Sequence, residues 1–214
     1  MRPQRTSNYD KWCDMWRDKF LTMDQERLMQ LLPELVPCGE FLTIQHFGKR
    51  YGVHRKLGHI VSLDDALPVS HTEQLNIYTL FGYVTPTAMF RDEWVTFDKL
   101  RSTSPFASAF HKGIILPFAR TFSGHVDSLH LASKSLGGVR LPYSDAGYQI
   151  EAFRCIPVRY LFWEGDEEFP AQANILFDKS ATDFIHGESI VTIAALGLRR
   201  LTENAGLNLN ASAF

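Results

Sequence analysis

Two nearly continuous apolar runs in the last third of the chain place the strongest constraint on its fold. They extend from Val158 to Trp163 and from Ala173 to Phe177, and a short acidic segment separates them. Apolar runs without polar alternation are typical of strands that are covered on both faces. We therefore expect both strands to lie in the interior of a sheet.

The most regular helical pattern follows these strands, from about Glu188 to Asn204. Its apolar residues recur three and four positions apart, which places them on one face of a helix; they are Ile190, Ile193, Ala194, Gly197, Leu198 and Leu201. Arg199 and Arg200 suit the negative end of the helix dipole. This helix should pack on the sheet.

The other elements are predicted from turn and capping residues. A Thr22-x-x-Gln25 pattern and a Ser70-x-x-Glu73 pattern indicate capping boxes. Two further helices are expected, one after Pro105 that breaks at Pro117 and one over His125 to Leu136. The β-type patterns predict a three-stranded meander over Phe41 to Leu63 and a strand over Tyr148 to Cys155.

Helices and strands are thus segregated along the chain. The expected class is α+β, with a mainly antiparallel sheet and helices at the N-terminus, in the middle and at the C-terminus. No linker divides the sequence, so we expect a single domain over residues 1–214, with an N-terminal helical arm at about residues 8–36.

Charge and cysteine content narrow the range of partners and compartments. Lys and Arg number 22 against 24 Asp and Glu, so no overall field favours nucleic acid or a membrane as partner. Cys13, Cys38 and Cys155 lie far apart, which argues against a disulfide framework and against an iron-sulfur cluster within this chain. The first residues lack the apolar stretch of a signal peptide. We therefore expect a cytoplasmic protein.

The acidic segment between the two apolar runs is the densest local charge. Glu164, Asp166, Glu167 and Glu168 are four acids within five residues. Such a segment can be a solvated strand connection, a dock for a basic partner, or part of a site for a hard metal ion. In the metal interpretation Asp166, Glu167 and Glu168 act together with Asp178.

Histidines offer a second set of candidate ligands. His125 and His130 lie five positions apart on a predicted helix, about 140° around its axis, so they do not suit one shared metal. Either could still be an axial ligand to a haem or corrinoid. His46, His54 and His59 belong to the predicted meander and could form a ligand trio. Common nucleotide-binding, hydrolase and zinc-peptidase motifs are absent from the sequence.

Residues 163–181, WEGDEEFPAQANILFDKSA, resemble the end of an uncharacterised bacterial and archaeal family, a domain of unknown function that carries W-x-GDEEFP followed by ILFD. Shorter matches extend the resemblance over most of the chain. Trp163, Phe169 and Pro170 suggest a structural motif, in which Phe169 enters the core beside Trp163 and Pro170 fixes the backbone before the next strand.

The resemblance also has a functional implication. Some members of that family carry an added iron-sulfur domain similar to that of corrinoid proteins, which implies a binding or accessory role beside a corrinoid or iron-sulfur enzyme of one-carbon metabolism. The three scattered cysteines of this chain cannot supply such a cluster, so a partner would have to hold it.

Three functions follow as alternatives. The first is a cytoplasmic binding or accessory protein. The second is a metal-dependent enzyme with a carboxylate-lined site built from Asp166, Glu167, Glu168 and Asp178. The third is a structural subunit of a larger assembly that docks through Trp12 and Trp16. The sequence assigns no catalytic residue, substrate or cofactor.

Overall fold

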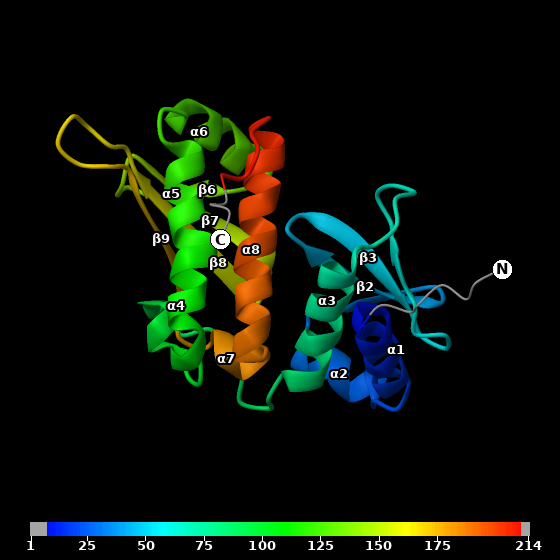
Figure 1. Cartoon of the computed structure of the whole chain (residues 1–214). Coiled ribbons are helices and arrows are strands. Elements are labelled where there is room, and N and C mark those ends of the chain that lie inside the picture. Colours follow the sequence, from blue (N-terminus) through cyan, green and yellow to red (C-terminus); the bar gives the residue numbers. More distant parts are fainter. Residues whose placement is uncertain (1–7, 211–214) are drawn as a thin grey trace.

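Two antiparallel sheets, each with its own helices, make up the computed structural model, which describes residues 8–210 (Figure 1). We call residues 8–83 the N-terminal lobe and residues 94–204 the C-terminal lobe. The α+β class with antiparallel sheets is confirmed, although there are two sheets rather than one. Buried apolar side chains of both lobes form one continuous cluster.

The N-terminal lobe contains a four-stranded sheet in the order β1-β2-β3-β4. Its elements are α1 (Asn8–Leu21), α2 (Gln25–Leu31), β1 (Val36–Cys38), β2 (Phe41–His46), β3 (Lys49–His54), β4 (Ile60–Ser62) and α3 (His71–Tyr83). The predicted meander is present, and β1 adds a fourth strand. Pro37 fits this edge strand because a missing amide hydrogen costs little where no further strand pairs.

Two capping predictions had different outcomes. The Ser70 hydroxyl accepts from the Glu73 amide, and the Glu73 carboxylate accepts from the Ser70 amide, so the capping box of α3 is confirmed. The Thr22-x-x-Gln25 box is wrong. Asp24 caps α2 by accepting from the Arg27 amide, while the Thr22 hydroxyl donates to the carbonyl of Lys19.

The C-terminal lobe contains a five-stranded sheet in the order β5-β9-β8-β7-β6. Its strands are β5 (Trp94–Thr96), β6 (Val139–Arg140), β7 (Ala146–Phe153), β8 (Ile156–Trp163) and β9 (Gln172–Asp178), and its helices are α4 (Ala107–Phe110), α5 (Leu116–Phe122), α6 (Val126–Ser135), α7 (Ala181–Phe184) and α8 (Gly187–Asn204). Three short helical turns, η1 (Phe97–Lys99), η2 (Ser104–Phe106) and the π-helical η3 (His111–Ile115), complete it.

The apolar run of β8 lies at the centre of this sheet, as predicted, with β9 beside it. Helices α4, α5 and α8 lie over one face (Figure 1). The expected cover on both faces is only partly present, because Leu161 on the other face is buried but Arg159 and Leu176 there are half-buried. The Trp94 ring of β5 lies 3.6 Å from the Arg159 guanidinium and supplies part of the cover there.

Pro117 does not break the helix that was expected to end there. The chain stays helical from Ala107 to Phe122 because the π-helical turn η3 precedes Pro117, which then occupies the first turn of α5. A first turn tolerates proline, since its amide would have no helical partner in any case.

Helix α8 connects the two lobes and agrees with its predicted range. One side packs on the C-terminal sheet and α6, and another contacts α3 of the N-terminal lobe (Figure 1). Gly197 lies where these surfaces meet, against the Tyr160 hydroxyl and the ring of Phe47. Among residues 8–210, no helix combines the length and the apolar composition needed to cross a membrane.

Two helical glycines should respond to alanine with opposite signs. We expect Gly197→Ala to lower the free energy of unfolding by about 1–3 kcal/mol, because a Cβ there would overlap Tyr160 and lie 2.8 Å from the Phe47 ring. Gly113→Ala is the matched control. A Cβ at Gly113 meets nothing within 4 Å, so alanine should stabilise by up to about 1 kcal/mol. Urea unfolding of both variants checks this, and a stabilised Gly197→Ala would contradict the packing at α8.

Candidate functional site

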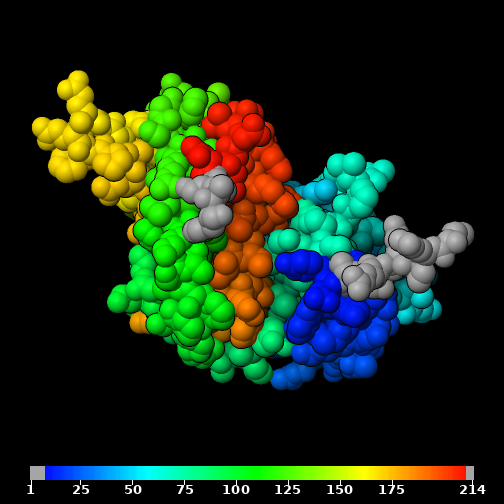
Figure 2. Space-filling model, viewed as in Figure 1, coloured from blue at the N-terminus to red at the C-terminus, as the bar shows by residue number. Residues whose placement is uncertain are grey.

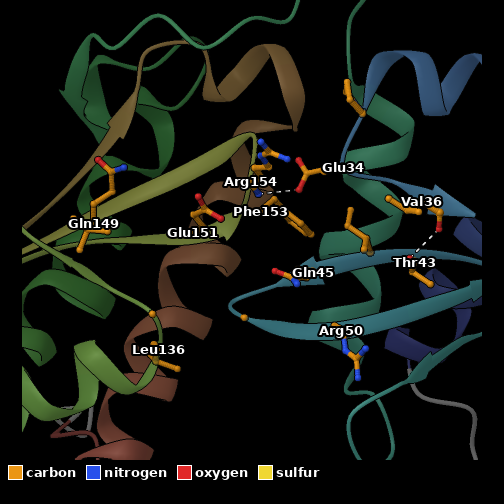
Figure 3. A pocket seen from close by; sticks show the side chains of 15 residues that line it. Glu34, Val36, Thr43, Gln45, Arg50, Leu136, Gln149, Glu151, Phe153 and Arg154 are labelled. Carbon is orange, nitrogen blue, oxygen red and sulfur yellow. Dashed lines mark hydrogen bonds between the residues drawn. The ribbon is translucent and has the colours of Figure 1, made fainter.

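A groove of about 470 Å³ lies where the two lobes face each other (Figure 3). Its volume is within the range of pockets that bind small ligands or parts of larger ones. Strands β1 to β3 supply one wall, with Val36, Thr43, Gln45 and Arg50. The opposite wall comes from β6, β7 and the segment between α6 and β6, with Leu136, Val139, Gln149 and Glu151.

A β-bulge closes the groove where the two sheets touch. The pairing of β7 with β8 shifts between Glu151 and Phe153, which leaves Ala152 as the extra residue. Its carbonyl accepts hydrogen bonds from the Phe47 amide at 2.9 Å and from Nδ1 of His46 at 2.7 Å. The bulge thus joins the C-terminal sheet to the β2–β3 turn.

Glu34 closes another side of the groove. Its carboxylate accepts hydrogen bonds from the backbone amide of Arg154 at 2.8 Å (Figure 3) and from that of Cys155 at 2.9 Å. Burial, together with the charge of Glu34, raises the pKa of the Cys155 thiol well above its usual value. Cys155 therefore stays protonated and is a poor nucleophile.

Both walls present strand edges that no other strand within residues 8–210 covers. Strand β1 begins at Val36, opposite Thr43, and β6 begins at Val139, opposite Gln149. The next outward-facing positions are Gln45 on β2 and Glu151 on β7.

Two backbone hydrogen bonds fix the direction in which these edges face. The Glu40 carbonyl accepts from the Arg55 amide on the β3 side, and the Gly147 carbonyl accepts from the Leu141 amide on the β6 side. Because successive residues of an antiparallel strand alternate between its two neighbours, Gln45 faces away from β3 and Glu151 faces away from β8. Their N–H and C=O groups therefore point into the groove.

A buried ion pair lies behind the N-terminal wall and connects α8 to the N-terminal lobe. Arg200 donates to the Glu73 carboxylate at 2.7 Å and to the Tyr51 hydroxyl oxygen at 2.8 Å, and Tyr51 donates to Glu73 at 2.6 Å. Burial raises the pKa of Glu73, but hydrogen bonds from Ser70 and Tyr51 and the charge of Arg200 outweigh it and bring this pKa to about 2. Glu73 therefore stays ionised.

His46 and Asn76 extend this network beneath the groove. Since Nδ1 of His46 donates to the Ala152 carbonyl, its Nε2 accepts from the Asn76 amide at 3.1 Å. Asn76 in turn accepts from the Thr192 hydroxyl of α8. The His46 ring stacks on Phe153 with a centroid distance of 4.2 Å. Burial lowers the pKa of His46 to about 3, so the ring is neutral near pH 7.

The acids Asp166, Glu167 and Glu168 lie far from the groove, at the tip of the β8–β9 hairpin, which projects from the body as the yellow segment in Figure 2. All three are exposed. Asp166 accepts from the backbone amides of Glu168 and Phe169, both at 2.8 Å. Glu164 turns back toward the body and accepts from the Gly124 amide.

Asp178 is not brought together with these three acids. It lies at the opposite end of β9, about 20 Å along the strand at 3.3 Å per residue. It is buried and accepts hydrogen bonds from the Ser180 hydroxyl and from the backbone amides of Ser180, Arg91 and Glu93. Burial raises the pKa of Asp178, but these hydrogen bonds outweigh burial and lower it. Within residues 8–210, no three His, Cys, Asp or Glu side chains are placed to hold a metal ion together.

The structural prediction for Phe169 is wrong. Its side chain is 61% exposed, and Trp163 is 39% exposed. The last β7–β8 pair is Ala146 with Phe162, whereas Trp163 still pairs with Gln172 of β9. The hairpin thus continues past the rest of the sheet, where no core is available. Pro170 precedes β9 by two residues.

The two histidines considered as axial ligands are not placed together. His125 is exposed at the start of α6, and His130 is half-buried with Nδ1 3.0 Å from the Tyr148 hydroxyl. Burial lowers the pKa of His130. In the N-terminal lobe, the rings of His54 and His59 are adjacent, whereas His46 lies at the other end of the β2–β3 hairpin.

Trp12 and Trp16 of α1, which were considered as a docking pair, differ in burial. Trp12 is 54% exposed, but Trp16 is buried in the core, where it packs against Gly82 and Tyr83 of α3. Of the two tryptophans, Trp12 alone lies on the surface of this helix.

Sequence reasoning missed the groove residues altogether. Gln45, Glu151 and Arg154 are ordinary polar residues within or beside strand patterns, and nothing local marks them. The capping box at Glu73 and the basic residue Arg200 are both visible in the sequence. The contact between Glu73 and Arg200 spans 127 positions, so it leaves no local signal.

Comparisons with known proteins identify the family to which this chain belongs. No curated protein and no solved structure gave a match. A family model described as a domain of unknown function, DUF3786, matches residues 28–200, which include every residue that lines the groove. Because this match covers well over half of the sequence, the chain belongs to the DUF3786 family.

Proposed function

We propose that this protein is a binding or accessory protein that holds an extended segment of a partner polypeptide in the groove between its lobes. The observation that carries the proposal is the pair of uncovered strand edges at Gln45 and Glu151, whose backbone groups face the groove from both walls. An extended peptide satisfies such groups by adding to a sheet edge.

The side chains of the groove suit the same ligand. Gln45 and Gln149 carry amides, which can donate to and accept from a peptide backbone. Val36 and Val139 are exposed apolar residues at the two rims. Together these groups offer hydrogen bonds along a backbone and apolar contacts beside it.

Some charged side chains of the groove have partners within the protein, and others do not. Arg50 is paired with Asp64 at 2.7 Å, and Glu34 is held by the amides of residues 154 and 155. Glu151 and the Arg154 side chain form no ion pair within residues 8–210. These two can meet charged groups of a bound segment, an acid near Arg154 and a base near Glu151.

The family resemblance supplies a candidate source for the segment. A corrinoid or iron-sulfur protein of one-carbon metabolism is the partner that it implies, and an extended segment of that protein would occupy the groove. Overlapping peptides that cover such a partner can be measured in the same assay as the random peptides described next.

The proposal is tested by deleting one backbone amide of the groove. Nine-residue random peptides are selected by display on the immobilised protein, and the dissociation constant of a selected peptide is measured by fluorescence anisotropy. We expect Gln45→Pro to weaken binding about fivefold to tenfold, because proline removes the N–H that faces the groove.

Gln45→Ala is the matched control, since it removes the side chain and keeps the amide. It should weaken binding less than Gln45→Pro. Both variants should keep the melting temperature of the wild type within a few degrees, because an edge position tolerates proline. Failure to select any peptide, or equal affinity of wild type and Gln45→Pro, would contradict the proposal.

A further inference from the structure

A second cavity, of about 500 Å³, lies directly beside the groove. Pro33, Glu34 and Arg154 line both cavities, so the Glu34 hydrogen bonds to the β7–β8 turn form the divide between them. The two cavities differ in character. The groove has polar and apolar side chains in both walls, whereas the second cavity is lined mainly by apolar side chains, Leu31, Leu32, Ala88, Met89, Phe90 and Phe184.

Two features of this apolar cavity are unusual for a surface that stays in water. Met89 is 71% exposed and Phe90 is 44% exposed, so large apolar side chains face solvent at its mouth. Thr85 also lines the cavity, and its hydroxyl is buried with no hydrogen-bond partner within residues 8–210. Buried polar groups are nearly always partnered, so this side chain can turn its hydroxyl toward an occupant of the cavity without breaking a hydrogen bond.

We propose that this cavity is the specificity pocket for one large apolar side chain of the same extended segment that occupies the groove. The inference rests on the proposed function and adds the ligand class: a peptide with an anchor of the Leu, Met or Phe type beside its groove-bound residues. The shared lining places the pocket at the end of the groove near Arg154, and the Thr85 hydroxyl donates to a carbonyl next to the anchor. Apolar anchors in desolvated pockets commonly supply much of the affinity of a peptide.

The alternative occupants fit less well. A small polar molecule would leave the apolar lining unused. A second copy of this chain would have to insert an exposed apolar segment past Met89 and Phe90, and the exposed hairpin residue Phe169 is flanked by acids that the acid Glu34 would repel.

The test is a double-mutant cycle that combines a substitution in the peptide with a substitution in the protein. Peptides selected on the wild type are expected to share one large apolar residue, and replacing it with Ala should weaken binding at least tenfold. Ala88→Trp fills the pocket from the protein side, with Ala88→Leu as a smaller replacement if the first variant does not fold. On the filled variant, the same Ala replacement in the peptide should cost less than twofold, because the anchor has no pocket to lose.

Thr85→Val gives a second readout that a purely structural role would not produce. It removes an unpartnered hydroxyl, so the free protein should melt at a higher temperature, while its affinity for the peptide falls threefold or more. Three results overturn the inference. If no peptide is selected, the proposed function fails and the pocket assignment fails with it. If peptides bind and respond to Gln45→Pro but show no shared apolar residue, or if the cycle is additive, the pocket assignment alone fails.

Discussion

Arg200→Met should lower the free energy of unfolding by about 3–5 kcal/mol, the largest effect that we expect from one substitution in this protein. Arg200 lies on α8 and donates to Glu73 and Tyr51 of the N-terminal lobe and to the Phe47 carbonyl at the β2–β3 turn. Methionine keeps much of the side-chain volume but leaves the Glu73 carboxylate buried without its counter-charge. Urea unfolding followed by circular dichroism measures the loss.

A neighbour on the same helix provides the matched control. Arg199 is exposed and lies 3.8 Å from Glu203, so Arg199→Met should change the free energy of unfolding by less than about 0.5 kcal/mol. The double variant Glu73→Gln/Arg200→Met should be more stable than Arg200→Met alone, because it no longer buries an unpaired charge. Equal losses for Arg199→Met and Arg200→Met would show that the buried pair does not connect the lobes.

Acid should destabilise the protein well above the pH at which carboxylates usually titrate. The pKa of His46 is about 3 in the folded protein against 6.5 for a solvent-exposed imidazole, so the unfolded chain binds one more proton between these values. Stability therefore falls as the pH is lowered from 6.5 toward 3, by about 1.4 kcal/mol for each pH unit and by about 4 kcal/mol over the whole window. Glu73 acts in the same direction below pH 4.5, because its pKa is also lowered, to about 2.

His46→Gln isolates the histidine contribution to this pH dependence. Glutamine retains hydrogen-bonding groups and has no proton to bind, so the variant should start less stable at pH 7 and lose less stability between pH 6.5 and 4.5. Free energies of unfolding from urea titrations at half-unit pH steps give both slopes. An unchanged slope would mean that His46 titrates normally and is not buried between Ala152 and Asn76.

Much of the fold follows from local patterns in the sequence. The spacing of Ile190 to Leu201 predicts α8, the box at Ser70 predicts the start of α3, and the apolar run from Val158 predicts the central strand. These features are local, so one segment contains all the information. The strand Trp94–Thr96 is not predicted, because three residues are too short for any periodicity to show.

The errors have a shared physical cause, which is that tertiary context overrode a local preference. Pro117 was expected to end a helix, but the π-helical turn before it removes the conflict. Phe169 was expected to enter the core beside Trp163, but the hairpin extends past every layer that could cover it. Neither the helical register nor the length of a hairpin relative to its neighbours is encoded at the residue itself.

The candidate site could not be predicted for a related reason. Its parts come from Glu34, Gln45 and Glu151, which the fold brings together only after both sheets have formed. The decisive feature is backbone rather than side chain: a bulge at Ala152 and two strands that end early. By contrast, Glu164 to Glu168 attract attention in the sequence, and the structure places most of them in solvent.

Amide hydrogen exchange at Gln45 and Glu151 tests the central claim most directly. Both amides face the groove, so NMR should show them exchanging rapidly in the free protein, in contrast to the paired amide of Ile44 on the same strand. With a selected peptide at saturation, we predict that exchange at Gln45 and Glu151 slows at least tenfold. Protection confined to the β8–β9 hairpin or to α1, with Gln45 and Glu151 unchanged, would contradict the assignment of the groove as the binding site.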